Sequence, residues 1–390
     1  MPNHLPTVVN VAVAVIHYQQ QYLLGFRHAA QHQGNRYEFV GGKIDADESP
    51  IAALIREVAE ETGMDISGIS GISGISESSA GAASQNHATT AIKLGRLHHD
   101  YGDKQVCLQV YKVALTAAQY QEYQHYEQGL EGQALKWVSK DTLLAGIYPL
   151  PAANRTILSW LSLPSQVVIT YPIAHFYRQT DIEPASLDKT NVEQDNSIAQ
   201  AAWLTYHQQH LPAAAWVYIR PKADDSAAIA AQLMQARPDI QTLLPMSLLS
   251  TQSLPNVQAL HLTHAEVMRW FNRHKTQAQH TTNHDHVGLS ATYPLIISCH
   301  DRDSIHAANQ LAALRVQQQL PPVIAIFLSP VMMTQSHPDT DALGWHQWSS
   351  LAQLADMPVI ALGGLAPAMH STATQYGAMS IAGIRQFHEG

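Results

Sequence analysis

Cysteine is scarce in this sequence. Its 390 residues include only two cysteines, Cys107 and Cys299, far apart along the chain. This excludes a disulfide framework and a cysteine-based zinc site, and it fits a reducing cytoplasm, where we expect the protein to act. Basic residues are also few, with 22 Lys and Arg against 31 Asp and Glu, for a net charge of −9. Because an acidic chain binds a phosphate backbone poorly, we expect no direct contact with nucleic acid.

Long apolar runs are missing as well. The apolar stretch at residues 8–16 is too short to span a bilayer, and no basic segment precedes it. We interpret this stretch as a first strand and expect no membrane partner.

Two features divide the chain. A sequence of 390 residues is long for one domain, so we expect two. The segment LSLPSQ at residues 161–166 separates a helix-like segment from a new strand and predicts domains at residues 1–163 and 167–390. Residues 67–90 form a repeat of small residues that buries little, and we interpret them as a mobile loop insertion.

Strands and helices alternate in the first domain. Hydrophobic periodicity predicts strands at residues 8–16, 21–26, 91–97, 105–114 and 134–138, and helices at residues 50–61 and 152–160. The helix at residues 50–61 has clear ends. Ser49 suits the N-cap and Pro50 the first helical position, while Gly63 suits the residue after the last turn.

The same helix concentrates negative charge. Glu57, Glu60 and Glu61 stand at i, i+3 and i+4, so their carboxylates share one face and repel one another. A bound divalent cation reverses the sign of that interaction, and oxygen ligands suit Mg²⁺, with Mn²⁺ as an alternative. The pattern predicts metal-assisted hydrolysis of a phosphoanhydride by an activated water. The alternative interpretation is a solvated acidic helix face.

A longer motif surrounds these carboxylates. It runs Gly42-x5-Glu48-x7-Arg56-Glu57-Val58-x-Glu60-Glu61-x-Gly63-Met64. It resembles the Nudix hydrolase box at every fixed position. Residues 8 to about 161 are similar to MutT-type 8-oxo-dGTP diphosphatases, apart from the insertion. Further similar segments are YEFVGGK, in which Val40 replaces a usual proline, HHDYGDKQVCL, EGQALKW and YPLPAANRTI.

This resemblance implies an α/β/α sandwich with a mixed sheet and a Mg²⁺-dependent diphosphatase. The metal ligands that it implies are the Gly41 carbonyl, Glu57, Glu60, Glu61 and Glu131. Arg56 would orient Glu57, and either Glu57 or Glu131 would help to deprotonate the attacking water. Arg27 and His32 would contact the phosphate and sugar side of the nucleotide. Phe39 and Asn154 would line the base pocket.

Asn154 offers a physical route to selectivity. Its amide carries donors and an acceptor, and oxidation of guanine at C8 turns the N7 acceptor into an N–H donor. A pocket paired with that pattern leaves polar groups unsatisfied when plain guanine enters. Two alternatives remain open at this point: Asn154 as the N-cap of the last helix, and Phe39 as an ordinary core residue.

The second half repeats a strand–helix unit. The predicted strands are residues 171–177, 215–219, 240–244, 259–262, 294–298, 323–328, 358–362 and 380–384, and the helices between them include residues 304–319 and 345–355. Eight such units point to a (β/α)8 TIM barrel. Glycines follow the seventh and eighth strands, where such barrels often bind a phosphate through backbone N–H groups.

These segments resemble thiamin phosphate synthase and its TenI-like relatives. The similar segments are IRPK, LHLTHAE, ISCH, LSPVMMTQSHP and PVIALGG. The resemblance implies ligand contacts at Arg220, Lys222, Thr334, Gly363 and Gly364, with solvated rim charges as the alternative for Arg220 and Lys222.

Departures from that family affect its diphosphate-metal site. Met246 and Ser247 replace an Asn-Asp pair, Glu266 replaces an aspartate, and His337 replaces a lysine. Since Met246 and Ser247 provide poor Mg²⁺ ligands, we interpret the barrel as a degenerate synthase that keeps a site for a phosphorylated, thiamin-related ligand.

The sequence therefore predicts Mg²⁺-dependent hydrolysis of 8-oxo-dGTP to 8-oxo-dGMP and pyrophosphate, which would protect DNA replication. Two alternatives remain. The hydrolase could act on damaged thiamin diphosphate beside an active synthase barrel, or the barrel could be a regulatory binder or stabilising scaffold.

Overall fold

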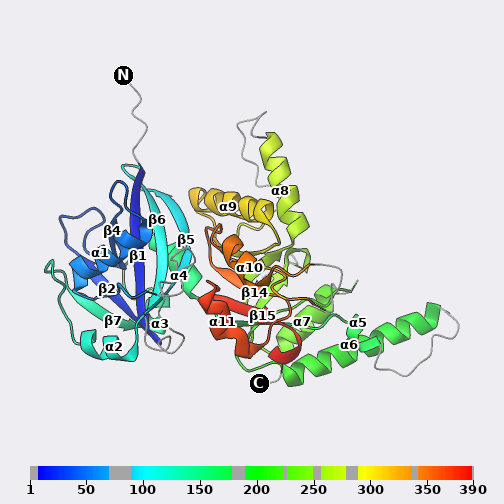
Figure 1. Ribbon diagram of the computed structural model, residues 1–390. Coiled ribbons are helices and arrows are strands. Elements are labelled where there is room, and N and C mark those ends of the chain that lie inside the picture. Colours follow the sequence, from blue (N-terminus) through cyan, green and yellow to red (C-terminus); the bar gives the residue numbers. More distant parts are fainter. Residues whose placement is uncertain are drawn as a thin grey trace.

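The computed structural model describes residues 8–69, 89–177, 189–223, 226–248, 256–277, 289–334 and 341–388. Most of the predicted insertion at residues 67–90 lies outside these ranges, as does His337. The described chain forms two α/β units side by side (Figure 1). No helix in these ranges is long and apolar enough to cross a membrane.

The first unit is built on a mixed sheet. Its strands are β1 (Val8–Tyr18), β2 (Gln21–Arg27), β3 (Arg36–Glu38), β4 (Val40–Lys43), β5 (Thr90–Asp100), β6 (Gln105–Ala114) and β7 (Leu135–Ser139). The main order is β3-β2-β1-β6-β5, while β4 pairs with β1 and β7 with β2. The β1–β6 pair is parallel and the others are antiparallel. All five predicted strands are confirmed, whereas the short β3 and β4 were not predicted.

Helices cover both faces of this sheet. They are α1 (Pro50–Thr62), α2 (Ala117–Tyr123), α3 (Lys140–Leu144) and α4 (Asn154–Leu161). Alternate residues of β1 point to opposite sides. Ala12, Ala14 and Ile16 pack in the cluster that contains α1 residues. Val13 and Val15 belong to the other cluster, which includes α4 residues and continues into the second unit.

The ends of α1 follow the sequence prediction. The Ser49 hydroxyl accepts a hydrogen bond from the Ala52 N–H over 3.1 Å, and Pro50 opens the helix. Gly63 ends it at φ 74°, with its N–H donating to the Ala59 carbonyl. Leu54 and Val58 are buried against the sheet. The helix is thereby fixed with its acidic face at the edge of the packed layer.

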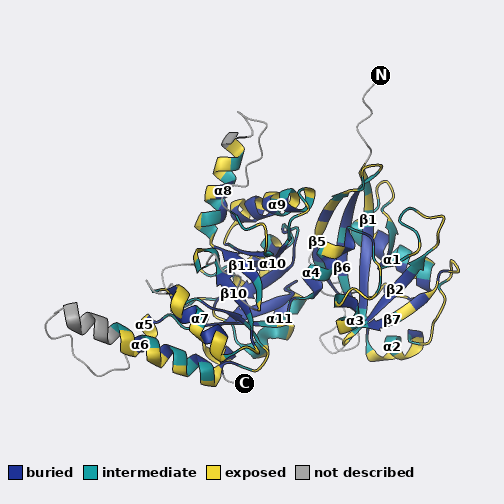
Figure 2. Ribbon diagram, turned by 180° about the vertical axis from the view of Figure 1, so that it is seen from behind, coloured by how far each residue is buried: buried dark blue, intermediate teal, exposed yellow. Residues whose placement is uncertain are grey.

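The second unit is a closed barrel of eight parallel strands, which confirms the predicted fold class. Its strands are β8 (Gln166–Ile169), β9 (Trp216–Tyr218), β10 (Gln241–Pro245), β11 (Val257–Leu262), β12 (Leu295–Cys299), β13 (Val323–Leu328), β14 (Val359–Leu362) and β15 (Ser380–Gly383). The longer helices around them are α6 (Lys189–His210), α7 (Ser226–Ala236), α8 (His264–Gln277), α9 (Arg302–Gln317) and α10 (Gly344–Ala352), and the short ones are α5 (Ala174–Tyr177) and α11 (His370–Gln375). Figure 2 shows buried strands enclosed by helices with exposed outer faces.

The predicted first barrel strand at residues 171–177 is wrong. The first strand is β8, and residues 174–177 form α5. Pro172 starts this turn, because its carbonyl accepts from His175 N–H. The Tyr171 ring stacks on His175 at 4.4 Å. The apolar residues that suggested a strand instead pack as aromatic side chains above the barrel. The first barrel strand, β8, is only four residues long.

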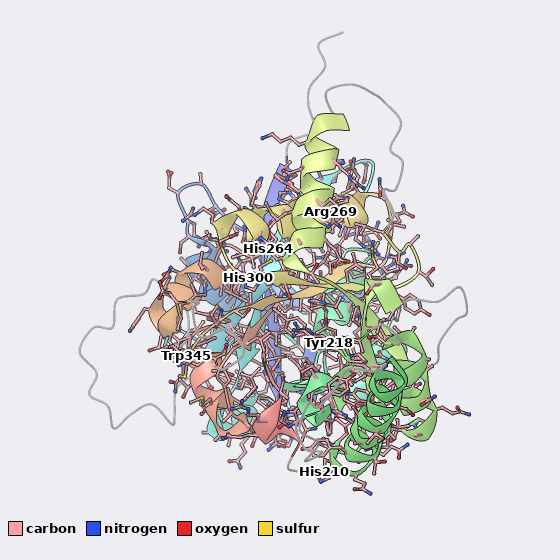
Figure 3. The ribbon with its side chains drawn as sticks, turned by 90° about the vertical axis from the view of Figure 1, so that its right-hand side faces the viewer. His210, Tyr218, His264, Arg269, His300 and Trp345 are labelled. Atoms are coloured by element: carbon pink, nitrogen blue, oxygen red, sulfur yellow. The ribbon has the colours of Figure 1, made fainter. Side chains whose placement is uncertain are left out.

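The two ends of the barrel face different surroundings. The first unit contacts the amino-terminal side: Trp160 Nε1 of α4 donates to the carbonyl of Val323, the first residue of β13, over 3.2 Å. The carboxyl ends of the strands lie on the other side. Figure 3 views the molecule from that side, with Tyr218, His264 and His300 facing the viewer and the first unit behind.

Candidate active site

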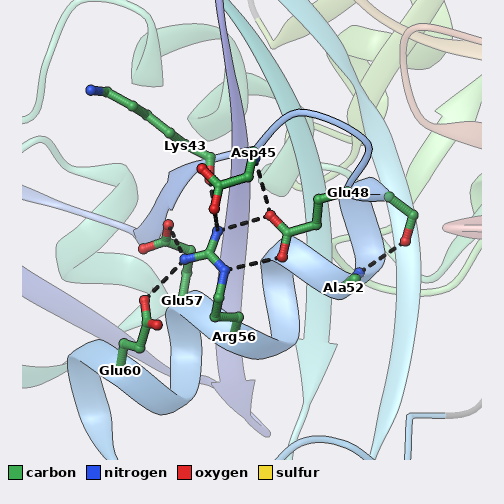
Figure 4. A network of polar contacts seen from close by, with 8 residues as sticks. Lys43, Asp45, Glu48, Ala52, Arg56, Glu57 and Glu60 are labelled. Carbon is green, nitrogen blue, oxygen red and sulfur yellow. Dashed lines mark hydrogen bonds and ion pairs between the residues drawn. The ribbon is translucent and has the colours of Figure 1, made fainter.

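Arg56 is the centre of a dense polar network (Figure 4). Its guanidinium binds Glu48 through two hydrogen bonds of 3.0 and 2.9 Å, and one terminal nitrogen donates to Glu57 and Glu60 over 2.8 and 2.9 Å. The other terminal nitrogen donates to the Lys43 carbonyl over 2.9 Å. Arg56 thus holds Glu57 in place, as expected. The structure adds Glu48, to which sequence analysis assigned no role although it belongs to the motif.

Two glycines of the motif leave room for this network. At Gly42, a Cβ atom would collide with the Glu57 carboxylate. Gly41 has φ 148°, and a Cβ there would collide with the Ala12 carbonyl of β1. The tight β1–β4 pairing therefore brings the backbone of residues 41 and 42 directly against the acidic face of α1.

Glu61 is the most perturbed acid of the cluster. Burial raises its pKa to about 8, and the negative charges of Glu38, Glu57 and Glu131 add to that rise, while a backbone hydrogen bond from Gly41 opposes it. Burial also raises the pKa of Glu57, which the bond from Arg56 counteracts. The protein groups alone therefore disfavour full ionisation of this cluster.

Glu131 comes to the cluster through the end of α1. The Leu130 N–H donates to the Glu61 carbonyl over 2.8 Å, and the Gln133 side chain donates to the same oxygen over 3.1 Å. This turn precedes β7 and places Glu131 within the electrostatic reach of Glu57 and Glu61. Segments 70 residues apart in sequence thus meet at one site.

The residue types at this site suit a divalent cation, but their side chains are not arranged as a complete set of metal ligands. Among the described residues, no three acidic, histidine or cysteine side chains converge as a metal cluster. Glu60 instead turns to Arg56 and is 55% exposed. The available donors are all oxygens. The pKa of Glu61 is raised mainly by burial and further by neighbouring carboxylates, and a divalent cation would favour the ionised form. These residues therefore fit a hard cation such as Mg²⁺ or Mn²⁺.

Arg27 and His32 lie together beside the sheet. Arg27 forms an ion pair with Glu38, and its Nε donates to the His32 carbonyl over 3.0 Å. His32 Nε2 lies 3.3 Å from Asp103 Oδ1. Since Glu38 also raises the pKa of Glu61, the Arg27–Glu38 pair connects the predicted nucleotide contacts with the acidic cluster.

Asn154 is the first residue of α4 and is not its cap. The N-cap is Ala153, and no side chain caps this helix, so the alternative of an Asn154 cap is wrong. The Asn154 side chain is 7% exposed. Phe39 is also buried, within the cluster that includes α4 residues.

Tyr101 is a candidate that sequence analysis did not single out. Its hydroxyl and the Ala153 backbone form a hydrogen bond, and its ring meets His32 edge-on at 5.0 Å. It follows β5 in the segment HHDYGDKQVCL, whose similarity to the family was the available signal. Tyr101 thus contacts both the start of α4 and a predicted phosphate-side residue.

The predicted barrel contacts all lie at carboxyl ends of strands. Gly363 and Gly364 follow β14 at φ 108° and 69°, where a Cβ atom would lie 2.8 Å from Pro330 and from Met332, respectively. Their conformation lets two loops touch. Thr334 belongs to the loop after β13. Arg220 and Lys222 follow β9, and burial lowers the pKa of Lys222, with the Arg220 charge adding to the effect.

Glu266 is engaged in a local helix cap. Its carboxylate accepts from the N–H and hydroxyl of Thr263, each over 2.7 Å, while its own N–H donates to Thr263. Met246 begins a short 3₁₀ turn after β10. The positions that replace the synthase metal ligands are therefore occupied by an apolar side chain and a capping acid.

A buried hydrogen-bonded chain lines this end of the barrel. The Tyr218 hydroxyl lies 2.7 Å from His261 Nδ1, and His261 Nε2 lies 2.8 Å from the Ser298 hydroxyl. Burial lowers the pKa of His261 to about 3. The imidazole is therefore neutral and can donate one hydrogen bond and accept the other. Sequence analysis missed this chain, although His261 and Ser298 lie in LHLTHAE and ISCH.

Comparison with known families assigns a domain to each half of the chain. Residues 6–161 match the NUDIX domain family, and residues 286–387 match the Thiamine monophosphate synthase family. The first unit is therefore a Nudix domain with its carboxylate helix in place. The C-terminal region carries a thiamine phosphate synthase-like domain, so the chain joins a Nudix hydrolase to a synthase-like barrel.

Individual relatives cover the Nudix domain. A CTP pyrophosphohydrolase from Escherichia coli is 29% identical over 151 residues, which are 39% of this chain and 89% of the relative. The 8-oxo-dGTP diphosphatase of the same organism is 26% identical over 39% of this chain and 95% of the relative. Among solved structures, the E. coli ORF135 protein is 25% identical over 39% of this chain and 87% of its own, with a TM-score of 0.27. The MutT protein of Methanosarcina mazei is 20% identical over 40% of this chain and 94% of its own, with a TM-score of 0.30.

The raised pKa of Glu61 predicts a pH-dependent cost in stability. The unfolded chain ionises this acid near its ordinary value of 4.5, before the folded chain does at about 8, so Glu61 lowers stability as pH rises between these values. In a chelator, Glu61→Gln should therefore have a higher Tm than wild type at pH 8 and a similar Tm near pH 5. Added Mg²⁺ should narrow the gap by stabilising the wild type.

Thermal melts over this pH range measure the effect. Glu122→Gln, which changes an exposed acid on α2, is the matched control and should show no such trend. A Tm difference for Glu61→Gln that does not change with pH would contradict the assignment of a repelling, buried carboxylate.

Proposed function

We propose that the Nudix domain, residues 1–163, hydrolyses 8-oxo-dGTP to 8-oxo-dGMP and pyrophosphate with Mg²⁺, removing an oxidised precursor before DNA replication in the cytoplasm. The observation that supports the substrate is the position of Asn154, a polar side chain that is 7% exposed at the start of α4. The Asn154 amide offers donors and an acceptor, so a ligand with a matching pattern of donors and acceptors would be favoured. The similarity to an 8-oxo-dGTP diphosphatase supports this choice.

The remaining site residues bind the nucleotide or hold the metal ion. Arg27 and His32 bind the phosphate and sugar side of the nucleotide, and Phe39 packs against the base. The Gly41 carbonyl, Glu57, Glu60, Glu61 and Glu131 would hold Mg²⁺, which would supply positive charge for the phosphates and a more acidic water molecule.

Arg56 orients the acidic cluster. It already holds Glu57 in place, whereas Glu60 would have to turn from Arg56 to reach a bound cation. Glu57 or Glu131 takes the proton from the attacking water. Burial raises the pKa of Glu57. A higher pKa makes a carboxylate a better proton acceptor, which suits Glu57 to this role.

A kinetic panel tests this function. The substrates are 8-oxo-dGTP, dGTP, CTP and thiamin diphosphate with its oxidised form, each measured with Mg²⁺. We expect the highest kcat/KM for 8-oxo-dGTP. Chelation should abolish turnover, and Glu61→Gln should lower kcat by roughly 100-fold or more, as when charge stabilisation at a reacting phosphate is removed.

Each other outcome of the panel is informative. Faster turnover of a thiamin diphosphate would replace the proposed substrate with the alternative, and a preference for CTP would follow the other relative. Turnover in excess chelator, or near-full activity of Glu61→Gln, would contradict the metal site itself.

Asn154→Ala tests base recognition. It should lower kcat/KM for 8-oxo-dGTP more than for dGTP, with a lost discrimination of about 1–3 kcal/mol, the cost of an unmatched buried polar group. Arg155→Ala, at the exposed next position of α4, is the control and should keep the preference. An equal loss on both substrates would mean that Asn154 does not contact the oxidised edge of the base.

For the barrel, residues 167–390, we propose binding of a phosphorylated, thiamin-related ligand without efficient synthesis. Gly363 and Gly364 offer backbone N–H groups where two loops meet, and Arg220 and Lys222 supply positive charge at the same end. A synthase must also hold diphosphate through Mg²⁺. Met246 and Ser247 are poor ligands for that ion, and Glu266 is engaged with Thr263.

The full-length chain tests this proposal. Given the pyrimidine diphosphate, the thiazole phosphate and Mg²⁺, it should form little or no thiamin phosphate, whereas calorimetry should detect thiamin phosphate binding. Gly364→Ala should weaken that binding because its Cβ would press on Met332. Synthesis with a kcat of about 1 s⁻¹ or more would identify a working enzyme instead.

A further inference from the structure

The contact between the two units involves two basic residues, Lys93, which is partly buried, and Arg96, whose side chain is 45% exposed. Lys93 of β5 donates from Nζ to the carbonyls of Gln353 and Ala355 over 2.8 and 3.0 Å. Burial lowers the pKa of Lys93, and the charge of Asp356 opposes that change. These carbonyls belong to the short connection from α10 to β14. The Lys93 ammonium group makes hydrogen bonds to two carbonyls in place of water molecules. Such directional contacts indicate a specific interface.

Arg96 forms the second part of the same contact. Its Nε lies 3.0 Å from Asp356 Oδ1, a terminal nitrogen donates to Oδ2 over 3.2 Å, and its backbone N–H donates to the Asp356 carbonyl over 3.2 Å. Between these two basic residues, Gly95 allows close approach, since a Cβ there would lie 2.5 Å from the Asp356 carbonyl and 2.8 Å from the Trp160 ring. The edge strand is thus fitted closely to the barrel.

The helix α4 extends from this contact to the base pocket. Trp160 is 2% exposed and donates to Val323, while Asn154 begins the helix two turns earlier. The helix has eight residues and no side-chain N-cap. Because so short a helix is marginal by itself, tertiary packing must hold it in place. Much of that packing comes from the barrel, whose β13 contacts α4.

A second connection follows β5. This strand carries Lys93 and Arg96 in its interior and ends at Asp100. The next residue, Tyr101, bonds to the Ala153 backbone and contacts His32. Both elements anchored on the barrel therefore end at the predicted nucleotide contacts.

A small pocket lies at this contact. A pocket between β5, α4 and α9, lined among others by His98, Thr156 and Asn309, has a volume of about 20 Å³. That is enough for a water molecule and too little for a nucleotide or a thiamin phosphate. The interface is therefore structural.

We propose that the barrel is a built-in support for the base-binding end of the Nudix site, with Trp160 and Arg96 as positioning residues that hold Asn154 and Tyr101. The proposal rests on the proposed function in one respect, the placement of the base near Asn154. It assigns the barrel a role in nucleotide recognition that requires no barrel ligand and no synthase chemistry.

Kinetics of interface variants test the proposal on the full chain. Trp160→Phe keeps a ring but removes the donor to Val323, and Arg96→Ala removes the pair with Asp356. Each should raise KM for the nucleotide that the wild type hydrolyses best by about 3- to 10-fold, the scale of one lost hydrogen bond. The kcat at saturating substrate should stay within about two-fold, because the acidic cluster lies on the other face of the sheet.

A matched control separates positioning from general stability. Arg237→Ala breaks the Arg237–Asp239 pair, which lies in the barrel away from the interface, and should leave KM unchanged. Assays are run well below each Tm. In the double-mutant cycle, Asp356→Ala should add little to the KM change of Arg96→Ala.

Two results would overturn the proposal. One is an unchanged KM in both interface variants despite a lowered Tm, and the other is an equal rise in KM for Arg237→Ala. Failure of the proposed function is a separate result, since a wild type that prefers another nucleotide over 8-oxo-dGTP still permits the comparison of KM values on that nucleotide.

Discussion

The two faces of β1 constrain the whole molecule. Side chains of a strand alternate, so Ala12, Ala14 and Ile16 pack with α1, whereas Val13 and Val15 pack toward α4 and the barrel. One strand therefore connects the acidic cluster with the interface between the units. A one-residue shift in its register would exchange both sets of contacts. The pairing of β1 with β4 and β6 prevents that shift and keeps Gly41 and Gly42 against α1.

Electrostatics then determine how the acidic face can exist before a cation binds. Arg56 binds three carboxylates and one carbonyl at once, which offsets part of the repulsion that Glu57 and Glu60 would otherwise experience. Glu61 forms no ion pair among the described residues and is partly buried, and its loss of solvation raises its pKa. The site thus combines Glu57, whose raised pKa is opposed by the bond from Arg56, with Glu61, whose pKa is raised to about 8. Such unequal environments are typical of sites that bind a cation and handle protons.

Local signals predicted the parts of the structure that depend on nearby residues. Ser49, Pro50 and Gly63 fix the ends of α1 through contacts within a few positions, and the predicted helix ends one residue before the observed one. The strand at residues 105–114 follows its apolar alternation and matches β6 at both ends. Predictions failed where contacts with residues distant in the sequence determine the local structure. Residues 171–177 have the composition of a strand, yet Tyr171 packs above the barrel and β8 precedes it.

The site shows the same division. The motif spacing predicted the carboxylates on α1, because one helix fixes their geometry. It could not predict that Glu48 would bind Arg56 through two hydrogen bonds, since that contact requires the loop before α1 to fold back. The caps of α4 also needed the structure, because Ala153 and not Asn154 precedes its first turn. No sequence pattern indicated that Lys93 would find its partners about 260 residues away.

The direction of the barrel has a consequence for the fusion as a whole. Tyr218, His264 and His300 face away from the Nudix domain, which covers the opposite, amino-terminal side (Figure 3). The acidic cluster in turn lies on the face of the Nudix sheet that points away from the barrel. A molecule released at one site would have to leave the protein and diffuse around it to reach the other. Covalent linkage therefore joins the two domains without bringing the acidic cluster near the carboxyl ends of the barrel strands.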